Sequence, residues 1–127
     1  MSKLFFENYD RIVFAGDSVT DMERVRPLGE GLFDSVGKGY VRVLENLLAA
    51  WYPEILVRIT NAGISGDTSR DLLARFEDDV VALKPDWVSI CIGINDVFGE
   101  SGPALELIHK YELDAEGIYK RVKAFVK

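Results

Sequence analysis

The stretch IVFAGDSVT, residues 12–20, decides the fold. Its first four residues form a continuous apolar run, typical of a parallel strand covered on both faces, and Gly16 ends that run. Ser18 therefore lies at the carboxyl end of a strand, where loops converge and ligands bind in open α/β sheets. Two roles are open to Ser18: a nucleophile activated by a base, or, with Asp17 and Thr20, a cap for the next helix.

Two later segments have the same form. The apolar run at residues 55–60 leads into the loop NAGISGDTS, residues 61–69, and the run at residues 87–92 ends in GIND, residues 93–96. If the strands are parallel, their carboxyl ends meet at one edge of the sheet, and three polar, glycine-containing loops gather there. Cys91, inside the third run, is expected to pack in the core.

The segments between these runs predict two helices and a loop. Apolar residues recur at helical spacing within residues 40–48 and 72–83, whereas residues 22–38 are rich in glycine and charge and predict a loop over the active edge. The alternation favours right-handed βαβ crossovers and a parallel sheet. With 127 residues, 48% of them hydrophobic and 28% charged, we expect one globular domain over residues 1–127.

The loop motifs also carry a resemblance. GDSVT at residues 16–20, NAGISGDTS and GIND are similar to the first three sequence blocks of the SGNH, or GDSL, hydrolase family, in the same order and at similar spacing. The resemblance covers residues 10–97. It implies a flavodoxin-like, three-layer α/β/α fold with a parallel sheet, and hydrolysis of esters and related acyl or acetyl groups without a metal or other cofactor.

The same resemblance implies roles for individual residues. Ser18 corresponds to the nucleophile, Gly66 to the backbone oxyanion donor and Asn95 to the side-chain oxyanion donor. These roles fit the chemistry, because attack on an ester carbonyl builds negative charge on its oxygen, which preorganised donors stabilise. Asp17 and Asp96, which adjoin Ser18 and Asn95, are candidate substrate-binding residues.

The general base has two interpretations. Family members carry an Asp-x-x-His pair near the end of the domain, and its histidine is the base. The single histidine of this chain is His109, fourteen positions after Asn95, and Glu106 stands where the aspartate is expected. Either residues 106–126 replace the terminal block and His109 is the base, or the chain stops after the third strand and the helix that follows it.

We favour the second interpretation, because the first leaves almost no sequence for a fourth and a fifth strand. His109 is then an ordinary surface residue in a variable loop, and the sheet is incomplete, with about three strands. An exposed edge on the third strand would allow self-association, because its backbone groups are unpaired.

Composition and charge argue against several classes of protein and of binding site. The net charge of −6 argues against nucleic acid as a partner, since phosphate binding needs a concentrated basic surface. No apolar run is long enough to span a membrane or to serve as a signal peptide, so we expect a cytoplasmic protein. One histidine and one cysteine do not form a zinc-ligand pattern, and a single cysteine allows no intrachain disulfide.

The sequence therefore predicts a serine esterase whose partner is a small-molecule acyl or acetyl ester, such as one on a carbohydrate. Two alternatives stay open. One is a catalytically impaired remnant that keeps the loops but lacks a base. The other is a non-catalytic flavodoxin-like module that binds a flavin or a phosphate at the loop after the first strand.

Overall fold

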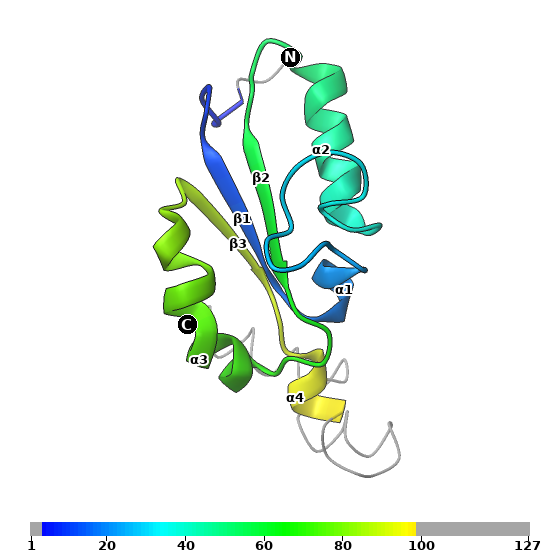
Figure 1. Cartoon of the computed structure of the whole chain (residues 1–127), viewed down its shortest axis with the longest axis vertical. Helices are drawn as coiled ribbons and strands as arrows, with labels where there is room; N and C mark the ends of the chain where they lie inside the picture. Colours follow the sequence, from blue (N-terminus) through cyan, green and yellow to red (C-terminus); the bar gives the residue numbers. More distant parts are fainter. Residues whose placement is uncertain (1–3, 99–127) are drawn as a thin grey trace, which may run out of the picture. The chain divides into compact units, whose positions relative to one another are not determined.

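The sheet has three parallel strands in the order β2-β1-β3, so the first strand of the chain lies in the middle. The computed structural model describes residues 4–98. The strands are β1 (Arg11–Gly16), β2 (Arg58–Gly63) and β3 (Trp87–Cys91) (Figure 1). Gly16 pairs with Gly63 on one side and with Cys91 on the other, so all three strands end at the same level. Their following loops therefore start from one edge of the sheet.

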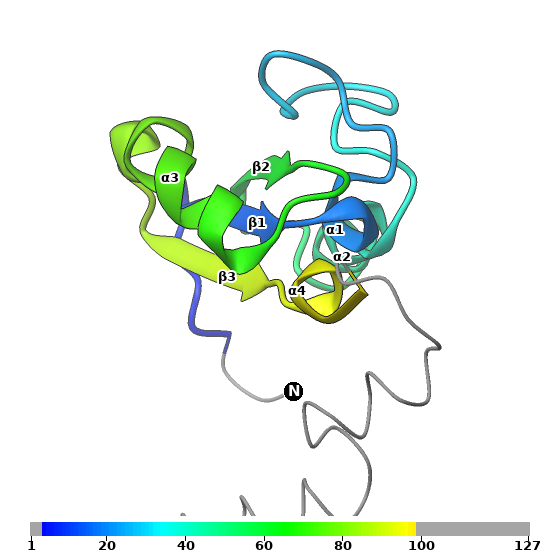
Figure 2. The same cartoon turned by 90° about the horizontal axis from the view of Figure 1, so that it is seen from below.

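Helices cover both faces of the sheet. Figure 2 shows α3 on one face and α1 and α2 on the other. The helices and helical turn, in chain order, are α1 (Ser18–Asp21), α2 (Tyr40–Trp51), α3 (Ser69–Asp79), the 3₁₀ turn η1 (Val81–Leu83) and α4 (Ile94–Phe98). The chain forms two compact units, residues 1–92 and 93–127, and α4 is the described part of the second.

Alternation along β1 divides the core into two clusters. Ile12 and Phe14 point to the α2 side, where they pack with Val41. Val13 and Ala15 point to the α3 side and are fully buried. Because successive side chains of a strand point to opposite faces, one apolar run supplies both layers of the core. The predicted α/β class and layered arrangement are thus confirmed.

The second strand corrects the sequence-based boundaries. Residues 55–57 precede β2, and Asn61, Ala62 and Gly63, which we had expected in a loop, belong to the strand. Asn61 pairs with Phe14 of β1, and its side chain is fully buried because three backbone groups satisfy its hydrogen bonds. The amide therefore behaves as part of the core.

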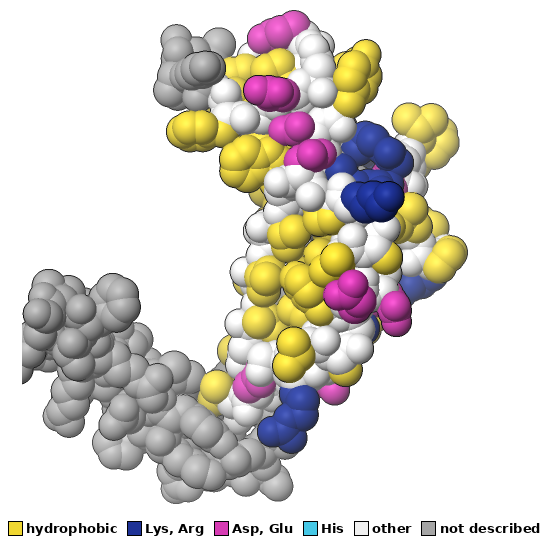
Figure 3. Space-filling view, turned by 90° about the vertical axis from the view of Figure 1, so that its left-hand side faces the viewer, with side chains coloured by type: hydrophobic (Ala, Val, Ile, Leu, Met, Phe, Trp, Pro, Cys, Tyr) yellow, Lys and Arg dark blue, Asp and Glu magenta, His cyan; other side chains and the backbone are white. Residues whose placement is uncertain are grey.

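The third strand differs from the buried strand expected from its apolar sequence. Four of its five residues are exposed, Cys91 among them, so the expectation that Cys91 packs in the core is wrong. Within the described residues β3 pairs only with β1, and no second strand covers its outer edge. Figure 3 faces the side on which α3 lies in Figure 1 and shows hydrophobic side chains gathered along it. Large exposed side chains of β3 are Trp87, Val88 and Ile90.

The segment at residues 22–38 is a loop, as predicted, and polar contacts hold it against the sheet. Gly29 forms an isolated antiparallel bridge with Asn61, along the outer edge of β2. The Glu30 carboxylate accepts hydrogen bonds from Arg11 at 2.9 Å, Arg58 at 2.9 Å and Thr60 at 2.7 Å. Burial raises the pKa of Glu30, but these hydrogen bonds outweigh it and hold that pKa below its usual value.

Candidate active site

The turn after β1 presents Ser18 at the surface. Asp17 caps α1, and its carboxylate accepts a hydrogen bond from the backbone N–H of Val19 at 3.0 Å. Asp17 is 2% exposed, whereas Ser18, the first residue of α1, is exposed. Thr20, the third candidate cap, instead bonds through its hydroxyl to that of Tyr40 at 2.9 Å. Asp17 alone therefore provides the side-chain cap, and the Ser18 hydroxyl is not used for it.

Two glycines let backbone segments approach each other at this edge. A Cβ atom on Gly16 would lie 2.3 Å from the carbonyl oxygen of Cys91 and 2.4 Å from Oγ1 of Thr20. A Cβ atom on Gly63 would lie 2.5 Å from the backbone nitrogen of Asp21. None of these three distances is possible for a real Cβ atom, so the strand ends and α1 pack together only because both residues are glycine.

The loop after β2 returns to the turn after β1. The N–H of Ile64 donates to the carbonyl oxygen of Gly16 at 3.0 Å. The N–H and hydroxyl of Ser65 donate to Oδ2 of Asp21 at 2.9 and 3.1 Å. Gly66 follows with φ +89, a left-handed conformation that favours glycine. Among the described residues other than its two chain neighbours, no atom lies within 4 Å of the position a Cβ would take. The structure thus brings the loops of Ser18 and Gly66 together.

Asp21 is a buried acid at the end of α1. Arg26 donates to both of its carboxylate oxygens, at 3.2 and 2.7 Å. Burial raises the pKa of Asp21, but the hydrogen bonds from Arg26 and Ser65 more than offset that effect and lower it to about 2. The carboxylate is therefore ionised at neutral pH.

Asn61 and Arg24 fix the backbone behind the turn. Nδ2 of Asn61 donates to the carbonyl oxygens of Thr20 at 2.6 Å and Val36 at 2.8 Å, while its Oδ1 accepts from the N–H of Gly63 at 2.9 Å. Nε of Arg24 donates to the carbonyl oxygen of Gly63 at 2.7 Å. The side chains of Asn61 in β2 and Arg24 in the loop after α1 therefore hold the end of α1 against the end of β2.

Arg75 of α3 reaches the same strand ends from the other face of the sheet. Its guanidinium donates to the carbonyl oxygens of Ala62 at 2.8 Å and Gly16 at 3.3 Å. It also pairs with Asp67 at 2.7 Å and with Asp79 at 3.1 Å. Cationic side chains on both faces thus hold the carbonyl groups at the ends of β1 and β2.

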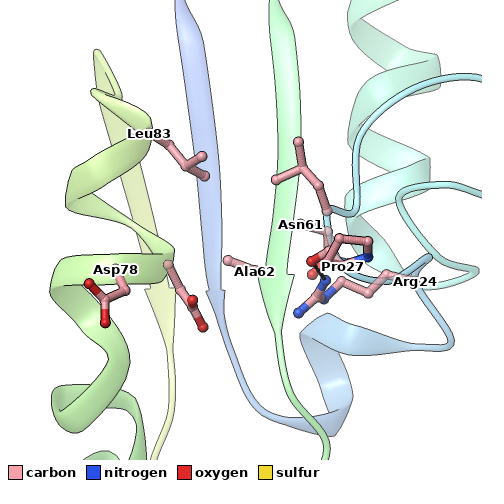
Figure 4. Close-up of a pocket in the computed structure, with 8 residues that line it drawn as sticks. Arg24, Pro27, Asn61, Ala62, Asp78 and Leu83 are labelled. Atoms are coloured by element: carbon pink, nitrogen blue, oxygen red, sulfur yellow. Dashed lines mark hydrogen bonds between the residues drawn. The ribbon is translucent and has the colours of Figure 1, made fainter.

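Two hollows lie away from this edge. One, of about 100 Å³, is lined by Arg24, Asn61 and Asp78 among others and lies between the loop after α1 and the end of α3 (Figure 4). The other, of about 300 Å³, is apolar and lies between α2 and β3, with Phe14 and Trp87 in its wall. Neither is lined by Ser18 or Gly66, which are exposed at the start of α1 and in the loop after β2.

The remaining predicted residues lie in the second unit. Asn95 and Asp96 belong to the first turn of α4, where both are half-buried and already engaged in interactions. His109 and Glu106 lie outside the described residues. Within residues 4–98, no three or more His, Cys, Asp or Glu side chains are grouped so as to hold a metal ion. No helix in that part of the chain is long and apolar enough to cross a membrane.

Comparison with known proteins decides the family. Residues 14–126 match the family of GDSL-like lipases and acylhydrolases. The chain belongs to this family. An acetylxylan esterase from Geobacillus stearothermophilus is 48% identical over an alignment of 123 residues, and the match covers 93% of this chain and 56% of that enzyme. The chain therefore spans about half the length of this relative.

Solved structures of similar enzymes share the fold. The structure of Axe2, an acetylxylan esterase from Geobacillus stearothermophilus, matches with a TM-score of 0.73 at 44% identity, over 84% of this chain and 56% of that chain. LAE5, described as an alpha/beta hydrolase enzyme from the metagenome of Lake Arreo, matches with a TM-score of 0.73 at 38% identity, over 87% of this chain and 58% of that chain.

The GDSL motifs located the edge but not the residues that support it. Asp21, Arg24, Asn61 and Arg75 were not singled out as functional, because arginines and acids in loops and helices are usually solvated. The sequence holds one indication of the role of Asp21, because an acid directly after GDSVT faces the strand ends if the turn is tight. Asn61 carried a weaker signal, as a polar residue that directly continues an apolar run.

Proposed function

We propose that this chain is a GDSL-type serine ester hydrolase acting on small acyl or acetyl esters, with Ser18 as the nucleophile. The observation that carries the proposal is the exposed Ser18 at the start of α1, whose hydroxyl is left out of the cap that Asp17 provides. Within residues 4–98 that hydroxyl has no hydrogen-bond partner, so it is available to a substrate and a base. We further propose that residues 1–127 belong to one domain of this type.

In the proposed reaction the Ser18 hydroxyl oxygen attacks the ester carbonyl carbon, and its proton passes to a general base. The carbonyl oxygen becomes an oxyanion, and the alcohol leaves when the tetrahedral intermediate collapses to an acyl-serine, which water then hydrolyses. The backbone N–H groups of Ser18 and Gly66 and the amide of Asn95 are the proposed oxyanion donors. Each donor of this kind contributes about 3 kcal/mol to transition-state stabilisation.

The hydrogen bonds at the start of α1 support the oxyanion-donor role that we propose for the N–H of Ser18. The cap of α1 uses the N–H of Val19, and the N–H groups of Thr20 and Asp21 donate to the carbonyl oxygen of Asp17. Among the described residues the N–H of Ser18 has no such acceptor, as is usual for the first N–H of a helix. It is therefore available to a developing oxyanion.

The proposed substrate is an acetyl ester on a carbohydrate. The relative from Geobacillus stearothermophilus is an acetylxylan esterase, and Axe2 is also described as an acetyl-xylooligosaccharide esterase. Structures of Axe2 exist for three variants, called catalytic mutants, in which a serine, an aspartate and a histidine are replaced by alanine. His109 is the histidine of this chain to be tested for the same role.

The test is hydrolysis of p-nitrophenyl acetate and of acetylated xylooligosaccharides by the parent chain and by Ser18→Ala and His109→Ala variants. Hydrolysis that is lost in Ser18→Ala supports the proposal. Equal loss in His109→Ala makes His109 the base, whereas unchanged hydrolysis in that variant excludes it. If the parent chain hydrolyses neither substrate faster than Ser18→Ala does, the chain is a catalytically impaired member of its family and the proposal is wrong.

A further inference from the structure

The carboxylate of Asp21 connects the two loops that carry the proposed nucleophile and the proposed backbone oxyanion donor. Asp21 is the last residue of α1, which starts at Ser18, and it is 3% exposed. Its Oδ2 accepts from both the N–H and the hydroxyl of Ser65, at 2.9 and 3.1 Å. Ser65 directly precedes Gly66. The buried Asp21 therefore lies three residues after the proposed nucleophile, Ser18, and is hydrogen-bonded to the residue before the proposed oxyanion donor, Gly66.

The bond pattern of Asp21 requires an ionised carboxylate. Arg26 donates to both oxygens, and the N–H of Arg24 lies 3.3 Å from Oδ1. All these partners are donors, and only a carboxylate without a proton accepts from every one of them. Charge-assisted bonds of this kind are stronger than neutral ones, so the position of Ser65 is strongly fixed.

Packing does not position Gly66. Apart from its two chain neighbours, no atom of residues 4–98 lies within 4 Å of the position that a Cβ would take, and its exposed backbone has the left-handed conformation. The peptide plane between Ser65 and Gly66 must therefore be oriented through its neighbours. Each residue has two soft backbone torsions, and holding both the N–H and the side chain of Ser65 restricts the first of them. The peptide plane itself turns on the second torsion, which the turn closed by the N–H of Asp67 and the carbonyl oxygen of Ile64 at 3.2 Å restricts. The contact to Asp21 thus fixes the direction of the Cα–C bond of Ser65 from which the N–H of Gly66 is oriented.

We propose that Asp21 is a positioning residue: it holds Ser65 so that the N–H of Gly66 faces the oxyanion formed at Ser18. The inference rests on the proposed function, because it gives Gly66 its oxyanion role. Within residues 4–98 no hydrogen bond joins the Asp21 carboxylate to the Ser18 hydroxyl. A misplacement of about 1 Å at a catalytic donor costs up to about a hundredfold in rate, so its removal would reduce kcat more than KM.

The test compares Asp21→Asn with Ser65→Ala, which removes the hydroxyl but keeps the N–H, and with Asp34→Asn, a loss of acid at an exposed position in the nearby loop. Kinetics with p-nitrophenyl acetate are measured well below the melting temperature of each variant. Two-dimensional amide NMR spectra report the fold and the Ser65 and Gly66 resonances. We expect kcat to fall about tenfold to a hundredfold in Asp21→Asn, with KM within about twofold. The kcat of Ser65→Ala should fall a few-fold, and the kcat of Asp34→Asn should equal that of the parent.

The NMR measurement separates positioning from a merely structural role. We expect the Ser65 and Gly66 amide resonances to shift in Asp21→Asn while those of the sheet stay in place, and not to shift in Asp34→Asn. If Asp21→Asn is folded but leaves the Gly66 resonance and kcat unchanged, the positioning role is overturned. If Asp21→Asn does not fold, the kcat and the Gly66 amide resonance of Ser65→Ala decide whether Asp21 has the positioning role.

Failure of the esterase proposal can be distinguished from failure of the positioning role of Asp21. A parent chain without Ser18-dependent hydrolysis refutes the esterase proposal, and the amide spectra alone then decide whether Asp21 orients Gly66. A selective shift at Gly66 supports the orientation, and an unchanged resonance overturns it.

Discussion

The guanidinium of Arg75 lies 3.3 Å from the carbonyl oxygen of Gly16, although the two residues are 59 positions apart in the sequence. The same group bonds to Ala62 and pairs with Asp67, so it joins the ends of two strands to α3. This contact is part of the framework that positions the loops after β1 and β2.

Replacing Arg75 by Met should destabilise the chain by about 3 kcal/mol, because the carbonyl oxygens of Ala62 and Gly16 and the buried carboxylate of Asp67 would lose the hydrogen bonds that the guanidinium donates. Urea denaturation, followed by circular dichroism, measures the free energy of unfolding. Arg70→Met is the matched control on an exposed position of α3 and should change that free energy by less than about 0.5 kcal/mol. Equal effects of the two substitutions would contradict the prediction.

Asn61 should be as sensitive as an apolar core residue. Asn61→Ala leaves the carbonyl oxygens of Thr20 and Val36 and the N–H of Gly63 without their partner, at a cost of about 3 kcal/mol. Asn46→Ala, at an exposed position of α2, is the control and should have little effect. Chemical denaturation of both variants checks this, and a loss below about 1 kcal/mol for Asn61→Ala would show that the amide is dispensable.

Gly16 and Gly66 should respond differently to alanine. Gly16→Ala places a Cβ against the backbone of Cys91 and should prevent correct folding. The Cβ of Gly66→Ala meets no described atom outside the adjoining residues, but the backbone keeps a positive φ, which costs about 1–2 kcal/mol. Thermal unfolding and the yield of soluble protein measure both effects. A soluble, fully stable Gly16→Ala variant would show that the backbone contacts at the strand ends are not needed.

Acid should weaken the contribution of Asp21. Its pKa is about 2 in the folded chain and 3.8 in the unfolded reference, so its stabilisation is fully present above about pH 4 and is lost as the pH falls towards 2. The difference in unfolding free energy between the parent and Asp21→Asn should therefore narrow by about 2 kcal/mol between pH 5 and pH 2. Denaturation at a series of pH values measures it. For Asn46→Ala, which changes no titratable group, the difference from the parent should stay constant.

The exposed edge of β3 should promote self-association. Ile90 is 55% exposed on a strand whose outer backbone groups have no strand partner within the described residues. Ile90→Lys should lower this concentration-dependent association, because a charge on an edge strand opposes pairing. Sedimentation velocity of the parent and the variant measures it. Leu73→Lys, at a 77% exposed position of α3, is the control for added charge alone. If both variants associate like the parent, β3 is not the surface involved.

The three strands could be predicted because each is an apolar run followed by a glycine-containing loop. The extent of β2 could not, since Asn61 is polar and becomes a core residue only when Thr20, Val36 and Gly63 are in place around it. The exposure of β3 was missed for a related reason. Its sequence is that of a buried strand, and burial depends on what packs against it rather than on its own composition.

The predicted site was located in part. GDSVT and NAGISGDTS predicted that the loops of Ser18 and Gly66 meet, and the contact between Asp21 and Ser65 joins them. The partners that hold those loops are distributed over β2, α3 and the loop after α1, and no local pattern relates them. The catalytic roles of Ser18, Gly66, Asn95 and His109 all stay predictions.

The central place of β1 has a consequence for synthesis of the chain. The strand that leads to Ser18 is translated first, yet its two neighbours in the sheet begin at residues 58 and 87. While the chain emerges from the ribosome, this apolar strand keeps both edges unpaired until the other two strands have been made. A nascent chain arrested before residue 87 would expose one of those edges, and so would be a substrate for chaperones.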